Sequence, residues 1–289
     1  MPLLQNFLPA DDLQLVPFPL ALVFVTAVGA LIGSFLNVVI HRLPREESVV
    51  FPSSRCPSCG AAIKPYDNVP VLSWLVLRGR CRSCKAAINA RDPAVEALTA
   101  LLFALVLLQT GLTAGLLPDL VFTAALVALV FIDAEHMILP DAITLPGVGF
   151  ALVARALVPN LYGVAFLCTP AGCPPAWALS LANAVLGAVA AGGFLWGVGW
   201  LWERLRDEEA MGLGDVKMML MVGAYLGWPL ALLTIFLGVL SGSVVGLALI
   251  ATGRSHLKSR LPFGVYLGVA AYVSLLYGRP LVEWYASQF

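Results

Sequence analysis

Charged residues are scarce in this sequence. Asp, Glu, Lys and Arg make up 12% of the 289 residues, whereas hydrophobic residues make up 60%. A soluble globular domain carries roughly 25% charged residues. The composition therefore excludes an ordinary soluble domain and predicts a chain that crosses a membrane several times. The net charge is zero, so the overall charge balance indicates no class of partner.

Two common sets of catalytic residues are also missing. The chain holds three histidines, and neither a Ser/His/Asp set nor an HExxH motif is found. Serine-protease and metalloprotease chemistry therefore lack the residues that they need. Residues 1–17 contain no basic residue, which a secretory signal peptide requires. We expect the first apolar run to stay in place as an anchor.

Apolar runs, by contrast, are abundant. A helix that crosses the bilayer needs about 20 apolar residues. Eight candidates cover roughly residues 18–40, 94–110, 116–133, 142–158, 177–202, 216–228, 229–251 and 262–278. The boundary between the sixth and the seventh rests on the turn signal Gly227-Trp228-Pro229. We therefore predict an all-α polytopic membrane protein with about eight transmembrane helices.

The positions of the basic residues indicate the orientation of these helices. Of the 17 Lys and Arg residues, nine lie in 42–91, three in 204–217 and three in 254–260, and Arg155 and Arg279 lie elsewhere. Loops rich in Lys and Arg stay in the cytoplasm. Eight spans with the N-terminus outside place 15 of the 17 basic residues on the cytoplasmic side.

One sizeable polar segment, residues 43–92, lies on the predicted cytoplasmic side. It holds two C-x2-C pairs with 21 residues between them, formed by Cys56, Cys59, Cys81 and Cys84. Four thiolates can bind one Zn²⁺ tetrahedrally and leave no open position, so we predict a small zinc-binding domain with a structural metal. Two disulfides are the alternative, which a cytoplasmic location disfavours.

Two further cysteines, Cys168 and Cys173, lie in the predicted outer loop 159–176. A bacterial periplasm would permit a disulfide between them. The sequence leaves a disulfide and two free thiols equally open.

Two acidic stretches lie at the ends of apolar runs. Asp133 ends one predicted helix, and Asp215 begins another directly after Gly212 and Gly214. An ionisable residue in such a position is costly enough to indicate a functional site. The glycines let the backbone bend and let another chain approach closely. Because both stretches lie at cytoplasmic helix ends, we expect Asp133 and Asp215 to meet and to form an aspartyl protease dyad.

Paired carboxylates suit acid–base hydrolysis. Two carboxylates that share a site do not both ionise readily, so one keeps a proton and polarises the scissile carbonyl while the other deprotonates a water. A helix N-terminus favours negative charge, which points to Asp215 as the ionised member. Asp141 is the rival of Asp133, but Pro140 places it on another element, where it suits an N-cap. Lys217 can assist the two carboxylates, or it can pack its apolar stem against the protein and keep its charged end in water.

These motifs resemble the bacterial prepilin peptidase family, also called type IV leader peptidases, which are GxGD aspartyl proteases. The resemblance covers nearly the whole chain. It rests on Gly33–Pro44, the four cysteines, Tyr66-Asp67-Asn68, Leu77–Cys81, Asp133, Leu139-Pro140-Asp141, Gly212–Lys217 and Pro262-Phe263-Gly264. Two positions depart from the family pattern: Asp92 stands where an aromatic residue is usual, and Val265 where proline is usual.

The resemblance implies a bifunctional enzyme of the bacterial inner membrane. Such an enzyme cleaves the leader of type IV prepilins or pseudopilins at the cytoplasmic face and then methylates the new N-terminus with S-adenosylmethionine. No glycine-rich fingerprint for that donor is found, so we place the second activity loosely in the loop 43–92, with Gly79 as a candidate. The expected partners are the precursors and the lipid bilayer, not nucleic acid. The oligomeric state stays open.

Three domains follow from this organisation: a transmembrane helix in 1–42, the zinc loop in 43–92 and a transmembrane peptidase domain in 93–289. A transporter or channel that binds a cation at Asp133 and Asp215 is the alternative from another class. Its carboxylates would lie near the bilayer midplane within paired half-helices, whereas these two lie at span ends. A structural scaffold would not need two aspartates beside flexible glycines.

Overall fold

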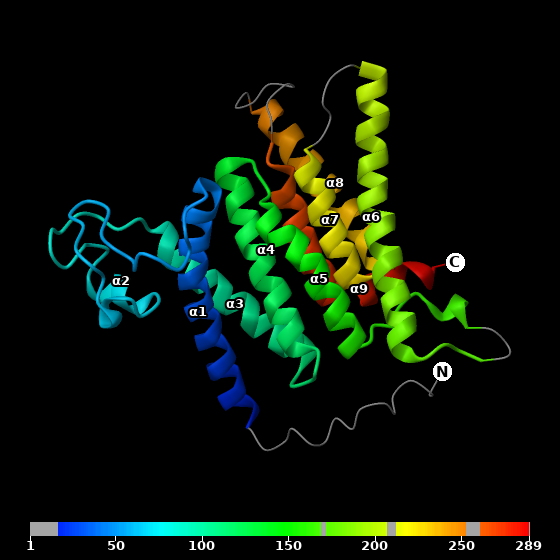
Figure 1. Ribbon diagram of the computed structural model, residues 1–289, viewed down its shortest axis with the longest axis horizontal. Coiled ribbons are helices and arrows are strands. Elements are labelled where there is room, and N and C mark those ends of the chain that lie inside the picture. Colours follow the sequence, from blue (N-terminus) through cyan, green and yellow to red (C-terminus); the bar gives the residue numbers. More distant parts are fainter. Residues whose placement is uncertain (1–16, 169–171, 207–211, 253–260, 289) are drawn as a thin grey trace. The chain divides into compact units, whose positions relative to one another are not determined.

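The computed structural model describes residues 17–168, 172–206, 212–252 and 261–288 (Figure 1). In these ranges the regular secondary structure is helical, apart from two isolated pairs of bridging residues. The chain divides into two compact units, Met1–Ala124 and Ala125–Phe289. The prediction of an all-α fold is confirmed for the described residues.

The first unit is built on two long helices, α1 (Phe18–Arg42) and α3 (Arg91–Thr110), which pack against each other. A Cβ atom on Gly33 would lie 2.7 Å from a Cα atom of α3, so glycine is needed for this close approach. Asn37 donates a 2.9 Å hydrogen bond from Nδ2 to the carbonyl oxygen of Asp92. This bond ties the end of α1 to the start of α3, so the intervening loop is closed at its base.

The loop between α1 and α3 contains one short α-helix, α2 (Leu72–Val76), and two 3-10 helices, Leu43–Arg45 and Pro65–Asp67. The backbone N–H of Val71, directly before α2, donates a 2.6 Å hydrogen bond to Oε2 of Glu96 on α3. The loop is therefore anchored to α3.

The second unit contains most of α4 and five further helices. Their bounds are α4 (Leu116–His136), α5 (Asp141–Leu157), α6 (Ala176–Arg206), α7 (Leu213–Leu226), α8 (Trp228–Ala251) and α9 (Phe263–Ala286). The central helix is α7, which packs against α5, α6, α8 and α9 (Figure 1). Every residue from Met221 to Leu226 is buried.

Eight helices form where the sequence predicts eight spans. Six of them, α1, α3, α4, α6, α8 and α9, are long and apolar enough to cross a membrane among the described residues. The other two are shorter, with 17 residues in α5 and 14 in α7. At 1.5 Å per residue α7 is only about 21 Å long, against a hydrocarbon core of about 30 Å. The protein is thus a multi-pass membrane protein, while the count of eight spans stays a prediction.

The predicted break between the sixth and seventh helices is confirmed. Gly227 separates α7 from α8 with a φ of +83°, a backbone conformation that favours glycine. Pro229 lies in the first turn of α8, where its missing N–H costs nothing.

A polar network closes this end of the second unit. Asn160 donates from Nδ2 to the carbonyl oxygen of Leu226 over 3.1 Å, and Arg155 donates from Nε to that of Tyr225 over 2.7 Å. Arg279 donates to Oδ1 of Asn160 over 2.9 Å. The last carbonyl groups of a helix have no partner within it, and these side chains supply partners at the end of α7. The two basic residues that lie outside the predicted cytoplasmic loops therefore both stabilise this network.

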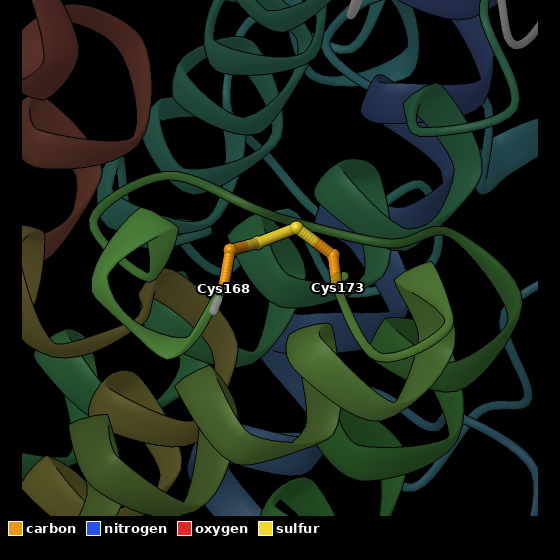
Figure 2. The surroundings of a disulfide bond; sticks show 2 residues. All are labelled: Cys168 and Cys173. Atoms are coloured by element: carbon orange, nitrogen blue, oxygen red, sulfur yellow. A yellow bond between two sulfur atoms is a disulfide. The ribbon is translucent and has the colours of Figure 1, made fainter. Parts of the chain in front are cut away.

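The loop between α5 and α6 contains a disulfide. Cys168 and Cys173 are joined, with their Cα atoms 4.4 Å apart (Figure 2). Of the two alternatives that the sequence leaves open, the structure has the disulfide. The division into domains at residues 42 and 92 stays a prediction, because the compact units divide near residue 124.

Candidate active site

Asp133 lies in the last turns of α4, and its side chain is held by the start of α9. The residue is 5% exposed. The backbone N–H of Val265 donates a 3.0 Å hydrogen bond to Asp133 Oδ2. A Cβ atom on Gly264 would lie 2.8 Å from the same oxygen, so glycine is required beside the carboxylate. The N-terminus of a helix suits a carboxylate because its first N–H groups have no partner within the helix.

Asp215 lies in the first turn of α7. Gly212 is the N-cap of this helix and has an extended backbone. The Asp215 side chain is partly buried, and the charge of Asp133 acts on it. The two carboxylates lie 82 positions apart in the chain, and the glycines beside them, Gly214 and Gly264, both border Leu139. The catalytic roles of the two carboxylates stay a prediction.

Leu139 connects the two helix starts that border this site. A Cβ atom on Gly214 would lie 3.0 Å from Leu139 Cβ, and one on Gly264 would lie 3.0 Å from Leu139 Cδ1. The glycine beside Asp215 thus admits a neighbouring segment of the same chain. Leu139 and Gly264 belong to the motifs that carry the family resemblance, but no local pattern indicates that they lie next to each other.

Asp141 and Lys217 form an ion pair. Lys217 Nζ lies 2.8 Å from each carboxylate oxygen of Asp141. The Lys217 side chain is 33% exposed and that of Asp141 is 54% exposed. The expectation that Asp141 caps α5 is wrong: Pro140 is the N-cap, Asp141 is the first helical residue, and no side-chain cap bond forms. The ion pair takes up the Asp141 carboxylate and joins the start of α5 to the start of α7.

The four cysteines of the first unit gather in one place. Their sulfur atoms all lie within 4.8 Å of one another, and none of the four is in a disulfide. Both pairs have the same local backbone. Cys56 N–H donates to the carbonyl oxygen of Ala61 over 2.9 Å, and Cys81 N–H donates to that of Ala86 over 2.8 Å. Each pair is thus a tight turn that presents two thiols to the other pair.

The chemistry of this donor set fits a zinc ion. Four cysteine sulfur atoms that lie this close together suit the tetrahedral coordination of Zn²⁺. The backbone N–H groups of Cys59 and Ser58 lower the pKa of the Cys56 thiol to about 6. A lowered thiol pKa favours the thiolate, which is the form that binds metal. These residues can therefore hold one metal ion.

Gly79 lies directly against Trp74. Its φ is +66°, and a Cβ atom there would lie 2.9 Å from Trp74 Cζ2. The indole in turn donates from Nε1 to the carbonyl oxygen of Ile88 over 3.3 Å. A side chain at Gly79 would therefore displace the Trp74 ring.

A cavity lies beside α2 in the same loop. Its volume is about 250 Å³, and Tyr66, Asp67 and Arg82 lie on its wall. Arg82 binds the Asp67 carboxylate with a shortest contact of 2.6 Å, and this hydrogen bonding lowers the pKa of Asp67. The Arg82 guanidinium also lies 5.5 Å from the centre of the Tyr66 ring. The wall thus combines an aromatic face, a carboxylate and a cation.

Comparison with known proteins covers both units. Residues 27–110 match the bacterial peptidase A24 N-terminal domain, and residues 120–247 match the type IV leader peptidase family. No solved structure matches the chain significantly.

Several curated proteins are similar over nearly their whole length. The chain is 39% identical to the prepilin leader peptidase/N-methyltransferase of Aeromonas hydrophila, over 93% of this chain and 94% of that protein. It is 37% identical to the protein of the same name from Pseudomonas aeruginosa, over 92% and 94% of the two chains. The corresponding protein of Burkholderia pseudomallei is 34% identical, over 94% and 90%. The chain therefore belongs to the type IV leader peptidase family.

Proposed function

We propose that this protein is a membrane-embedded aspartyl endopeptidase with a second, methyltransferase activity. It removes the leader of type IV prepilins or pseudopilins and then methylates the new N-terminal amine with S-adenosylmethionine. The observation that carries the proposal is that the helix ends bearing Asp133 and Asp215 both border Leu139, through Gly264 and Gly214. The names of the similar proteins support both activities.

The peptidase reaction is assigned to the two carboxylates. One deprotonates a water molecule that attacks the peptide carbonyl, and the other, protonated, polarises the carbonyl oxygen. No covalent intermediate is needed. The Val265 N–H and Gly264 fix the position of the Asp133 carboxylate. Because Asp133 also lies against a helix N-terminus, the dipole argument no longer singles out Asp215 as the base, and the dyad titrates as a pair.

The loop 43–92 is assigned to zinc and to the methyl donor. Cys56, Cys59, Cys81 and Cys84 would hold a structural zinc, which stabilises a segment too small to build a large core. S-adenosylmethionine supplies an electrophilic methyl group when bound. An aromatic ring and a carboxylate suit its sulfonium and ribose, so the cavity lined by Tyr66 and Asp67 supports a donor site in this loop.

The proposed location is the bacterial inner membrane, with the dyad and the zinc loop on the cytoplasmic side. The distribution of basic residues supports this orientation. We do not retain the transporter alternative. Its carboxylates would lie at the midplane, whereas Asp133 lies near the end of α4 and Asp215 in the first turn of α7, and the similar proteins carry a peptidase name.

The dyad makes a first prediction. Asp133→Asn and Asp215→Asn should each reduce prepilin cleavage by at least about 100-fold, because each removes one partner of acid–base catalysis. Asp141→Asn is the matched control and should retain activity, since Asp141 pairs with Lys217 instead. Cleavage is measured by the mobility shift of a prepilin in membranes. An inactive Asp141→Asn together with a normal Asp133→Asn would overturn the assignment.

Gly264 makes a second prediction. Gly264→Ala should lower the cleavage rate by up to about 100-fold, because the added methyl group displaces a positioned carboxylate. Gly193→Ala on α6 is the matched control, since a Cβ atom there meets nothing within 4 Å. Both variants should purify in equal amounts and unfold at similar temperatures. Wild-type cleavage by Gly264→Ala would show that the α9 start does not position Asp133.

The cysteines make a third prediction. The purified protein should contain about one zinc per chain, as a four-cysteine site requires. Metal is measured by atomic emission, and Cys81→Ser should lose it. Short treatment with a chelator should leave cleavage unchanged, because hydrolysis uses no metal. Four freely alkylated thiols in the native protein would contradict the assignment.

Gly79 makes a fourth prediction. Gly79→Ala should reduce N-methylation of the mature pilin, measured by mass spectrometry, while leader removal continues. Gly60→Ala is the matched control because Gly60 has a similar φ of +69° but meets nothing within 4 Å. Equal effects of the two variants would attribute the loss to backbone strain. Equal loss of cleavage and methylation would show that the loop supports the whole fold.

A further inference from the structure

A cleft opens between α8 and α9 in the second unit. Its volume is about 480 Å³. One wall is the face of α8 from Val239 to Ile250, and the other is formed by Leu261, Phe263 and Tyr266. Apart from Ser243 and the Tyr266 hydroxyl, these walls are apolar. The cleft is therefore suited to an apolar occupant.

The cleft arises because α8 and α9 separate along their length. A Cβ atom on Gly238 would lie 2.8 Å from Leu267 Cδ2, so the helices are in tight contact there. A Cβ atom on Gly242 would lie 3.4 Å from its nearest neighbour, Tyr266 Cδ2, and one on Gly246 would lie 3.3 Å from Leu261 Cδ1. At Gly246 only one side-chain atom of the described residues comes within 4 Å. The packing thus loosens toward the end of α8 that leads to α9.

The open end of the cleft adjoins the proposed catalytic site. Phe263 lines the cleft and is the first residue of α9. The next residue, Gly264, contacts the Asp133 carboxylate, and Val265 donates to it. The end of the cleft at Phe263 therefore directly precedes the residues that contact Asp133. An occupant that extends out of the cleft at this end reaches the Asp133 carboxylate.

The cleft faces the bilayer. Val239 is 47% exposed, Leu247 67% and Ile250 37%, and α8 is one of the helices long and apolar enough to cross a membrane. From Val239 to Ile250 the wall extends about 16 Å, from a rise of 1.5 Å per residue. This is about half of the roughly 30 Å hydrocarbon core. An occupant would lie in the half of the membrane nearer to the dyad.

We propose that this cleft receives the apolar helix of the precursor and presents the end of that helix to Asp133 and Asp215. The inference rests on the proposed function and names the surface that holds its substrate. A peptide bond at the membrane face can reach the dyad only if the rest of the substrate helix stays beside the bundle in the lipid. Small residues such as Gly242 and Gly246 let a second helix approach closely, and Ser243 supplies a hydroxyl for an interhelical hydrogen bond.

Photo-crosslinking tests which molecule occupies the cleft. A photoreactive phenylalanine is placed at Val239 or at Leu247, in an Asp215→Asn background that keeps the prepilin uncleaved. Val244 is the matched control: it lies on the same helix and is 58% exposed, but does not line the cleft. We expect prepilin adducts several times stronger at 239 and 247 than at 244. Equal adducts at all three positions, or adducts with lipid or a second copy only, would overturn the proposal.

A kinetic variant tests the same point with the active enzyme. Ser243→Trp fills the cleft and should raise KM for membrane-embedded prepilin about tenfold, equivalent to about 1.4 kcal/mol, with little change in kcat. Val244→Trp should leave both constants unchanged. An unchanged KM in a folded Ser243→Trp variant would refute substrate binding in the cleft, but not the proposed peptidase activity. A wild-type protein that cleaves no prepilin refutes the proposed function itself.

Discussion

The contact between the backbones of α6 and α7 determines where Asp215 lies. Gly187 and Gly223 face each other so closely that a Cβ atom on either would overlap the carbonyl group of the other. Tight contact of this kind fixes both the distance and the rotation between two helices. At the far end, Arg155 and Asn160 bind the last carbonyl groups of α7. These contacts fix α7 along its axis relative to α6. The position of Asp215, in the first turn of α7, is therefore also fixed.

At the other end of α7, the first turn lies against Leu139 and the start of α5. The dyad lies where three helices begin or end, and small or flexible residues border it: Gly212, Gly214 and Gly264. A site made of helix ends offers backbone N–H groups that no helix uses. Asp133 already accepts one of them from Val265. A backbone N–H group at a helix start thus supplies a hydrogen-bond partner for the Asp133 carboxylate inside an apolar bundle.

The sequence predicted the features that local patterns determine. Apolar runs located the eight helices, Gly227-Trp228-Pro229 located the break between α7 and α8, and the spacing of the cysteines predicted their cluster. Other contacts between particular side chains of distant segments could not be predicted. The ion pair of Asp141 with Lys217 replaced the expected cap, because the start of α7 lies against the start of α5. Likewise, the ring that meets Gly79 belongs to Trp74, which local spacing does not reveal.

The hydrogen bond from Asn37 to Asp92 closes the base of the cysteine-bearing loop between α1 and α3. The chain leaves α1 and returns to α3 at nearly the same point, so the helix pair does not depend on the loop to bring its ends together. The entropy of closing a loop grows only slowly with its length. A long loop at this position therefore adds little to the entropic cost of holding α1 against α3. The cysteine-bearing segment is therefore a closed insertion between two helices that already pack against each other.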